Sequence, residues 1–467
     1  MKKKWTYRIP IVVGLLLVVA GLGGCTKSFL SPKPNTSIVV PDSLSDFEGL
    51  LNNNVMAQTT ALPLLSADEY YYASYGSWEG TPTATERNAY VWAEDLYNAE
   101  NPIDDWNVPY EQIFYANVIL EGLPNIPVTA NNTNQYNLIQ GWAFFARGFA
   151  LYNLVSEFAP LYDSNTATQD LGVPIRLTAD VNVIEPRSSV KQTYAQVFAD
   201  LAQADIYLPL HGPPSTLNVP SKIALWALYA RIYLSISNYT QALTYADSCL
   251  LYDASLMDYN TLDTTSIAPI NTINAETLVF YTAPAQYLAT VIGAPAQSLI
   301  DTTLYQSYDS NDLRKHVYFF IRGGNVFMKK GYLGSTGGLY PFTGLATDEV
   351  YLIKAECQAR ANNVAGSLQT LNTLLATRYA TGTFVPYTAA SAQQALSLIR
   401  AERKKELVWR GLRWPDLKRF NKEGQNVTTL VRYLDGQTYT LPPNDPRYVL
   451  PIPQYEIDQS GITQNPR

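Results

Sequence analysis

Residues 226–250 read WALYARIYLSISNYTQALTYADSCL, and this stretch contains the pattern of two paired helices. Aromatic and small residues recur in it at the spacing W-x2-L-G-x2-Y, which is typical of the first helix in one class of helical repeat. The positions of this spacing are filled by Trp226, Tyr229, Ala230 and Tyr233. Ala242 then falls on the second helix, where a small residue lets two antiparallel helices approach closely. The stretch therefore predicts a helix pair at 222–235 and 239–251.

This pairing is that of a tetratricopeptide repeat, and a second, degenerate copy runs from Tyr351 and Ala355 through Ser367 to Leu374. A single pair cannot bury its apolar face, so such pairs must stack on one another. Helical spacing of apolar residues also marks 109–123, 134–158, 188–208, 347–361, 366–379 and 392–409. The sequence therefore predicts a mostly α fold, with a tetratricopeptide-like scaffold of about eight main helices.

Two helix-rich regions, at about 109–251 and 347–420, alternate in this prediction with two loop-rich regions. Residues 52–105 and 253–345 are rich in Tyr, Gly and Thr, and we expect long, irregular, aromatic-rich loops there. Prolines recur through the last thirty or so residues, which we expect to be extended and packed rather than helical.

The first 24 residues have the order of a secretory signal. Four basic residues precede Ile11–Ala20, which is an almost unbroken apolar run. Leu22-Gly23-Gly24-Cys25 follows and resembles a bacterial lipobox, in which the signal is cut before the cysteine and the cysteine is diacylated. We therefore expect residues 1–24 to be removed, and Cys25 to anchor a single domain of residues 25–467 to a membrane.

Composition excludes several classes of function. Hydrophobic residues make up 47% of the chain, which excludes a disordered protein. The formal charge is −7, and it becomes −11 without the four bases of the signal, so a nucleic-acid partner is not expected. Two histidines and three cysteines offer little for histidine catalysis or a zinc site, and we expect neither metal nor cofactor. Cys249 and Cys357 lie in helical patterns that favour burial as small hydrophobes, although export would permit a disulfide.

Several blocks of sequence, in order, resemble the SusD/RagB family of outer-membrane lipoproteins. The most specific is ERKKEL at 402–407, followed by GLRWPDLKR at 411–419. ARGFALYNLV at 146–155 is similar to a helix of the family, and so is EVYLIKAE at 349–356. LPIP at 450–453 is similar to the way family members end. The resemblance runs through almost the whole mature chain.

The resemblance implies a non-catalytic protein that is lipid-anchored in the outer membrane and exposed at the cell surface. Such a protein captures a nutrient, usually a glycan, and delivers it to a SusC-like TonB-dependent transporter. An acidic chain repels polyanions, so a neutral oligo- or polysaccharide is favoured, with peptide ligands as an alternative. Two further alternatives are a lipid-anchored glycosidase and a tetratricopeptide adaptor that binds a protein partner.

Aromatic residues of the two loop-rich regions are the predicted ligand contacts, because aromatic faces suit the C–H patches of sugar rings. They are Trp78, Tyr75, Tyr72, Tyr281 and Tyr287. For a glycosidase, the candidate acids are Asp68, Glu69, Asp104 and Asp105. Adjacent carboxylates rarely flank one glycosidic bond, so solvated loop charges are expected instead. The basic residues of 400–419 alternate with acids and predict ion pairs along a helix face.

Overall fold

The helix pair predicted around residues 222–251 forms as α9, Lys222–Ser235, and α10, Tyr239–Tyr252. A serine and an asparagine cap the two N-termini by accepting a hydrogen bond from a backbone N–H. Ala230 and Ala242 are completely buried, as close packing of the two helices requires. The sequence therefore placed both helices of this pair to within one residue.

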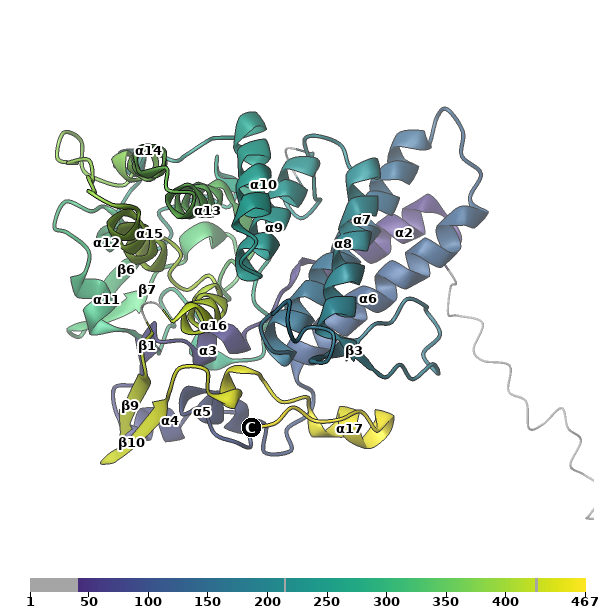
Figure 1. Ribbon diagram of the computed structural model, residues 1–467, viewed down its shortest axis with the longest axis horizontal. Helices are drawn as coiled ribbons and strands as arrows, with labels where there is room; N and C mark the ends of the chain where they lie inside the picture. Colours follow the sequence, from purple (N-terminus) through teal and green to yellow (C-terminus); the bar gives the residue numbers. More distant parts are fainter. Residues whose placement is uncertain (1–40, 214–215, 425–426) are drawn as a thin grey trace, which may run out of the picture. The chain divides into compact units, whose positions relative to one another are not determined.

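The structure, a computed structural model, describes residues 41–213, 216–424 and 427–467, of which 43–467 form one compact unit. The signal and Cys25 lie outside the described residues. The other main helices are α6 (Asp104–Gly122), α7 (Thr133–Phe158), α8 (Val190–Tyr207), α13 (Thr347–Arg360), α14 (Val364–Ala376), α15 (Ala392–Glu406) and α16 (Arg413–Glu423). Within the unit, α6, α7 and α8 lie side by side, and α13, α14 and α15 lie beyond α10 (Figure 1). The predicted mostly α fold is confirmed.

Among the helix boundaries that differ from the prediction, two have a clear physical cause. α6 begins at Asp104 rather than at Pro109, because two aspartates in its first turn favour a helix N-terminus. The helix predicted at 392–409 ends at Glu406, and α16 follows as a separate helix. Gly411 between them has φ +74°, a left-handed conformation that breaks the helix and that glycine adopts without strain.

Glycine lets α7 and α8 pack closely. A Cβ added at Gly148 of α7 would lie 2.9 Å from Cδ2 of Leu201 on α8. A Cβ added at Gly141 would lie 2.9 Å from the backbone nitrogen of Leu208, which follows α8. Arg147 of α7 forms a buried ion pair with Asp200 of α8, with Nη2 2.6 Å from Oδ1. The two helices are therefore held together by both steric fit and charge.

Short elements fill the regions that the sequence predicted as irregular. The short helices are α2 (Leu44–Leu51), α3 (Leu62–Ser66), α4 (Tyr75–Glu79), α5 (Ala84–Tyr90), α11 (Thr302–Gln306), α12 (Arg314–Val317) and α17 (Gln454–Ser460). Described strands pair antiparallel as β1 (Tyr70–Tyr71) with β5 (Leu299–Ile300), β2 (Leu171–Pro174) with β3 (Arg187–Ser189), β4 (Thr277–Val279) with β8 (Leu345–Ala346), β6 (Phe319–Arg322) with β7 (Asn325–Met328), and β9 (Leu430–Leu434) with β10 (Gln437–Leu441). The prediction of an extended rather than helical tail is thus wrong in part, because α17 is a helix within it.

Candidate functional site

The short helix α4 lies in the middle of the first loop-rich region, and none of its residues is buried. The hydroxyl of Ser74 begins this helix by accepting a hydrogen bond from the N–H of Ser77 at 3.1 Å. Tyr75 is 39% exposed and Trp78 is half-buried, with their ring centroids 5.4 Å apart at an angle of 45°. The indole N–H of Trp78 donates to the carbonyl of Arg87 at 3.0 Å, which fixes the ring. α4 thus presents two adjacent aromatic rings in a defined orientation.

The β9–β10 hairpin lies beside α4 (Figure 1). Tyr439 pairs with Arg432 in the hairpin register, and both side chains face the body of the protein. The pKa of Tyr75 is raised by Glu79 first, then by burial and by Asp435 in the hairpin turn, with a smaller effect of Tyr439. Tyr75 is therefore close enough to the hairpin to sense its charge. We call Tyr75, Trp78, Glu79, Asp435 and Tyr439 the α4–hairpin surface.

Arg432 fixes the hairpin to the body of the protein. Its Nη1 and Nη2 donate to the carbonyls of Tyr70 and Ala67, each at 2.5 Å. Its guanidinium also lies over the ring of Tyr90, 4.3 Å from the centroid. Hydrogen bonds from a charged donor in a buried site are strong, so the hairpin is held rigidly next to α4.

Three of the predicted ligand contacts are buried instead. Tyr72, Tyr281 and Tyr287 belong to the main hydrophobic core, and Tyr287 has no exposed surface. Tyr281 stacks on Phe149 of α7 with ring centroids 5.5 Å apart. A ring inside the core offers no face to a sugar, so these three residues are corrected to packing residues. Sequence could not separate them from Tyr75, because all of them lie in loop-like stretches with similar neighbours.

Tyr439 and Asp435 were missed by the sequence reasoning. The sequence nevertheless contains the pattern of a hairpin. Two strand-like runs, LVRYL at 430–434 and QTYTL at 437–441, flank the turn dipeptide Asp435-Gly436. Alternating strand patterns around Asp-Gly are a strong hairpin signal.

Three of the four candidate glycosidase acids, Asp68, Glu69 and Asp105, are not solvated loop charges. Asp68 accepts from Arg413 Nε at 2.7 Å and from Lys404 Nζ at 2.9 Å, and these cations hold the pKa of its carboxyl well below the ordinary value despite burial. Asp105 is fully buried and accepts from two backbone N–H groups at the start of α3. The expectation of solvated charges was therefore wrong for Asp68, Glu69 and Asp105, which are packed within the protein, while Asp104 is half-buried.

The buried carboxyl of Glu69 should make the free energy of unfolding depend on pH. Burial first, and then the charge of Asp68, raise its pKa from 4.5 to about 8. Between these two pH values the folded protein holds a proton that the unfolded chain releases. The free energy of unfolding should therefore fall as pH rises from 4.5 to 8, by up to about 1.4 kcal/mol per pH unit from this group.

The variant Glu69→Gln has no such proton and should remove this slope. Urea unfolding of the wild type and the variant across pH 4.5–8 measures the difference, which should grow in favour of the variant as pH rises. Glu94→Gln, at an exposed position, is the control and should leave the pH profile unchanged. A constant difference between wild type and Glu69→Gln would contradict the argument.

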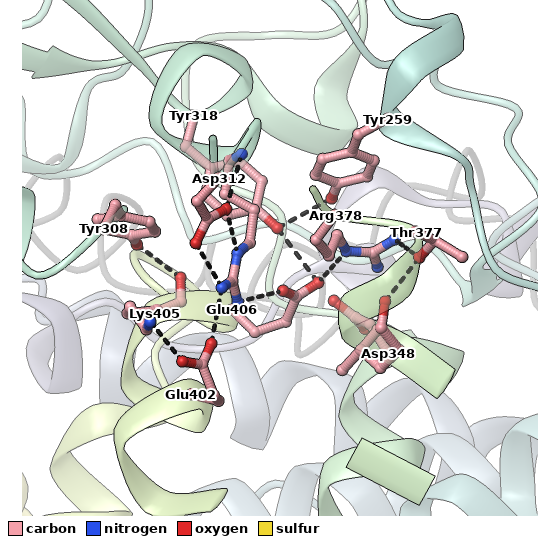
Figure 2. Close-up of polar contacts among 12 residues, drawn as sticks. Tyr259, Tyr308, Asp312, Tyr318, Asp348, Thr377, Arg378, Glu402, Lys405 and Glu406 are labelled. Atoms are coloured by element: carbon pink, nitrogen blue, oxygen red, sulfur yellow. Dashed lines mark hydrogen bonds and ion pairs between the residues drawn. The ribbon is translucent and has the colours of Figure 1, made fainter. Parts of the chain in front are cut away.

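Helix α15 contributes Glu402, Lys405 and Glu406 to a large buried polar cluster (Figure 2). Arg378 binds Glu406 at 2.7 Å and Glu276 at 2.7 Å, and Arg314 binds Glu406 at 2.9 Å. Some expected helix-face pairs exist, such as Lys405 with Glu402. Most of the strong pairs nevertheless join segments far apart in sequence. The carboxylates of this cluster are engaged in holding α15 to its neighbours.

Three further features concern metal binding, membrane spans and the two cysteines of the described residues. Across residues 41–213, 216–424 and 427–467, no three His, Cys, Asp or Glu side chains are grouped as a metal would require. Within the same ranges, no helix combines the length and hydropathy needed to cross a bilayer. Cys249 and Cys357 are buried as free thiols, as their helical patterns favoured.

Comparisons with known proteins agree with this architecture. Residues 28–234 match a family model described as starch-binding and associating with the outer membrane, and residues 256–467 match that of the SusD family. The chain belongs to the SusD/RagB family. No curated protein matches it.

Solved structures of other SusD-like proteins share the fold. A SusD superfamily protein from Bacteroides thetaiotaomicron aligns with a TM-score of 0.73 at 21% identity, over 91% of this chain and 100% of its own. Surface glycan-binding protein A from Bacteroides uniformis aligns at 0.70 and 17% identity, over 91% and 99%. A laminarin-binding SusD-like protein aligns at 0.63 and 18%, over 91% and 97%. At these identities the likeness supports the fold alone.

Proposed function

We propose that this SusD/RagB protein captures a neutral oligo- or polysaccharide at the α4–hairpin surface and delivers it to a SusC-like TonB-dependent transporter. Cys25 anchors it by lipid to the outer membrane, at the cell surface. The observation that carries the binding step is the ring pair Tyr75–Trp78, held beside the hairpin with partial exposure. In this proposal the protein binds without catalysing a reaction.

The chemistry of the surface fits a neutral sugar. The tilted rings of Tyr75 and Trp78 offer apolar faces for the C–H patches of pyranose rings. Glu79, one turn of α4 from Tyr75, and Asp435 in the hairpin turn carry carboxylates that can accept hydrogen bonds from hydroxyl groups. Both carboxylates, and the net negative charge of the chain, disfavour uronic-acid or sulfated polymers.

The named relatives support the same class of ligand. One solved relative is described as a surface glycan-binding protein and another as laminarin-binding. The match of residues 28–234 to a family described as associating with the outer membrane supports the location. The candidate acids Asp68 and Asp105 hold other groups of the protein, which favours binding over hydrolysis.

Affinity electrophoresis tests the binding step. The chain from Thr26 onward is run in gels cast with laminarin, starch, xylan, pectin or alginate, and one neutral polymer should retard it. The double variant Tyr75→Ala/Trp78→Ala should lose the retardation, with the dissociation constant at least tenfold weaker, because stacking of each ring contributes on the order of 1 kcal/mol.

Tyr252→Ala removes a half-exposed ring on α10 and serves as the control, with retardation expected to persist. If the double variant is retarded as strongly as the wild type, the α4–hairpin surface is not the site. Retardation by pectin or alginate alone would contradict the neutral class. Release of reducing ends from a retarding polymer would show an enzyme and overturn the non-catalytic assignment.

A further inference from the structure

The loop between β2 and β3, residues 175–186, holds three large aliphatic side chains in contact with solvent. Leu177 is 45% exposed, Val181 68% and Ile184 62%. Exposed apolar residues that are scattered singly are ordinary, but three of them in one short loop mark a surface that contacts a partner or a membrane. We call Leu177, Val181 and Ile184 the loop triad. None of the three belongs to the α4–hairpin surface.

The loop has a defined conformation, which places these side chains in water. Nη2 of Arg176 donates to the carbonyls of Val181 at 3.4 Å and Val183 at 3.2 Å. At the tip, Oδ1 of Asp180 accepts from the backbone N–H of Asn182 at 2.9 Å, as in a turn closed by an aspartate. The exposed aliphatic groups are thus positioned before any contact forms, and pre-positioned groups bind at a low entropic cost.

The chemistry of the loop favours an apolar partner. Its charges balance, because the acids Asp180 and Glu185 are matched by the bases Arg176 and Arg187. Charge therefore neither drives nor opposes binding strongly. Aliphatic side chains also lack the flat aromatic faces on which sugar rings pack, so the loop triad is not a second site for glycan.

The loop lies at the end of the molecule where the chain from Cys25 enters. The backbone N–H of Ala179 donates to Oε1 of Glu121, in the last turn of α6, at 2.8 Å. The ring of Phe47 packs against the same turn, because a Cβ added at Gly122 would lie 2.6 Å from its Cζ. Phe47 is in the first turn of α2. The loop and the start of the compact unit therefore meet at one end of α6.

The proposed lipid anchor brings this end of the molecule close to the bilayer. Residues 26–42 join Cys25 to α2, and a chain of this length spans at most about 60 Å, at roughly 3.3–3.6 Å per residue. The loop reaches the bilayer at a smaller extension of this tether than surfaces on the far side, such as α14 (Figure 1). A tethered protein needs little further affinity for a second contact, because the tether raises its effective concentration at the surface.

We infer that the loop triad inserts into the surface of the bilayer that holds the anchor, and so fixes how the domain lies on the membrane. This inference rests on the proposed anchor at Cys25. Aliphatic side chains gain by burial at the boundary between headgroups and acyl chains. The loop backbone stays at the level of the headgroups, because a loop cannot satisfy its own polar groups in hydrocarbon.

Environment-sensitive fluorescence of the lipidated full chain on phosphatidylcholine vesicles tests the inference. Val181→Cys supplies one accessible thiol for the dye NBD, because Cys249 and Cys357 are buried and the anchor occupies the thiol of Cys25. On vesicles the emission should shift to shorter wavelength, and nitroxide-labelled lipids should quench it. Gln369→Cys, at an exposed position of α14, is the matched control and should show neither change.

A second variant tests whether apolar contact causes the shift. Adding Leu177→Asp and Ile184→Asp to the Val181→Cys chain should abolish the shift and the quenching, because carboxylates oppose insertion. Both positions are largely exposed, so the melting temperature should be unchanged. Retardation by the neutral polymer should also be unchanged, because the loop is not part of the α4–hairpin surface.

Flotation with the vesicles reports the anchor separately. A chain that floats while the dye at position 181 stays in water overturns the inference and leaves both the anchor and polymer capture standing. A chain that does not float overturns the anchor, and the inference with it. A dye shift that appears with native outer-membrane vesicles but not with protein-free vesicles assigns the loop to a protein partner and likewise overturns the inference.

Discussion

Arg378→Met will lower the free energy of unfolding by about 3–5 kcal/mol, the range for breaking a buried ion pair by removing one partner. Arg378 has no exposed surface and binds the carboxylates of Glu276 and Glu406. Its guanidinium also lies 4.1 Å from the ring centroid of Tyr259 (Figure 2). Methionine has a similar volume but leaves the buried carboxylate of Glu276 without its cation and that of Glu406 with Arg314 alone.

The pKa of Glu276 strengthens this expectation. Burial raises it to about 7 even with Arg378 present, and Arg378 is the largest influence that lowers it. Without Arg378, Glu276 should take up a proton at higher pH, so the loss of stability should be larger at pH 8 than at pH 5. The sign follows because a raised carboxyl pKa destabilises the folded state at pH values above the unfolded pKa.

Urea unfolding at pH 5 and pH 8 measures both effects. Lys354→Met is the control, because Lys354 pairs with Asp247 at a site that is partly solvent-exposed. That pair should contribute less than about 1 kcal/mol. Equal losses in Arg378→Met and Lys354→Met would show that the buried cluster contributes no more to stability than a surface ion pair.

The second large effect is expected for Arg432→Leu, which should lower both the stability of the protein and its affinity for the polymer. The variant loses two charged hydrogen bonds to backbone carbonyls and the contact with Tyr90, which together should cost about 3 kcal/mol. The hairpin should then no longer hold Asp435 and Tyr439 beside Tyr75. We expect retardation by the neutral polymer to weaken at least tenfold, although no residue of the α4–hairpin surface has changed.

Hydrogen exchange of the 430–441 amides measures the hairpin directly and should be faster in Arg432→Leu. Tyr433→Ala is the control on the same hairpin, because Tyr433 points outward and is 77% exposed. It should leave both unfolding and hydrogen exchange unchanged. Weak polymer binding with unchanged hairpin exchange would mean that Arg432 does not act by positioning the hairpin.

The tyrosines of the first loop-rich region show that local sequence does not predict which aromatic rings are exposed. Tyr75 and Tyr72 lie three positions apart in one loop-like stretch, yet Tyr75 is exposed and Tyr72 is buried against Tyr90 and Tyr70. Their chain neighbours are alike, so local sequence carries no information about which ring finds a partner. Segments far along the chain complete the cluster around Tyr72, because Trp409 packs on Tyr70 and Arg432 lies over Tyr90.

The ion pairs formed by residues 400–419 likewise depend on segments that are distant in sequence. The alternation of acids and bases at 400–419 predicts pairs along a helix, and Lys405 with Glu402 is one of them. The sequence does not show that Glu406 pairs with Arg314 and Arg378 instead, because those partners come from α12 and from the segment after α14. An ion pair between distant segments exists only once the fold has brought them together.

The sequence by itself determined most of the long helices, the pairing of α9 with α10, and the family. Periodicity and small residues such as Ala230 and Ala242 act within one or two helical turns, so they can be read directly from the chain. Only the tertiary structure decided which aromatic rings face solvent, and that the hairpin completes the surface around Tyr75. These properties depend on the packing of segments that are distant in sequence, and such packing leaves no local periodic signal.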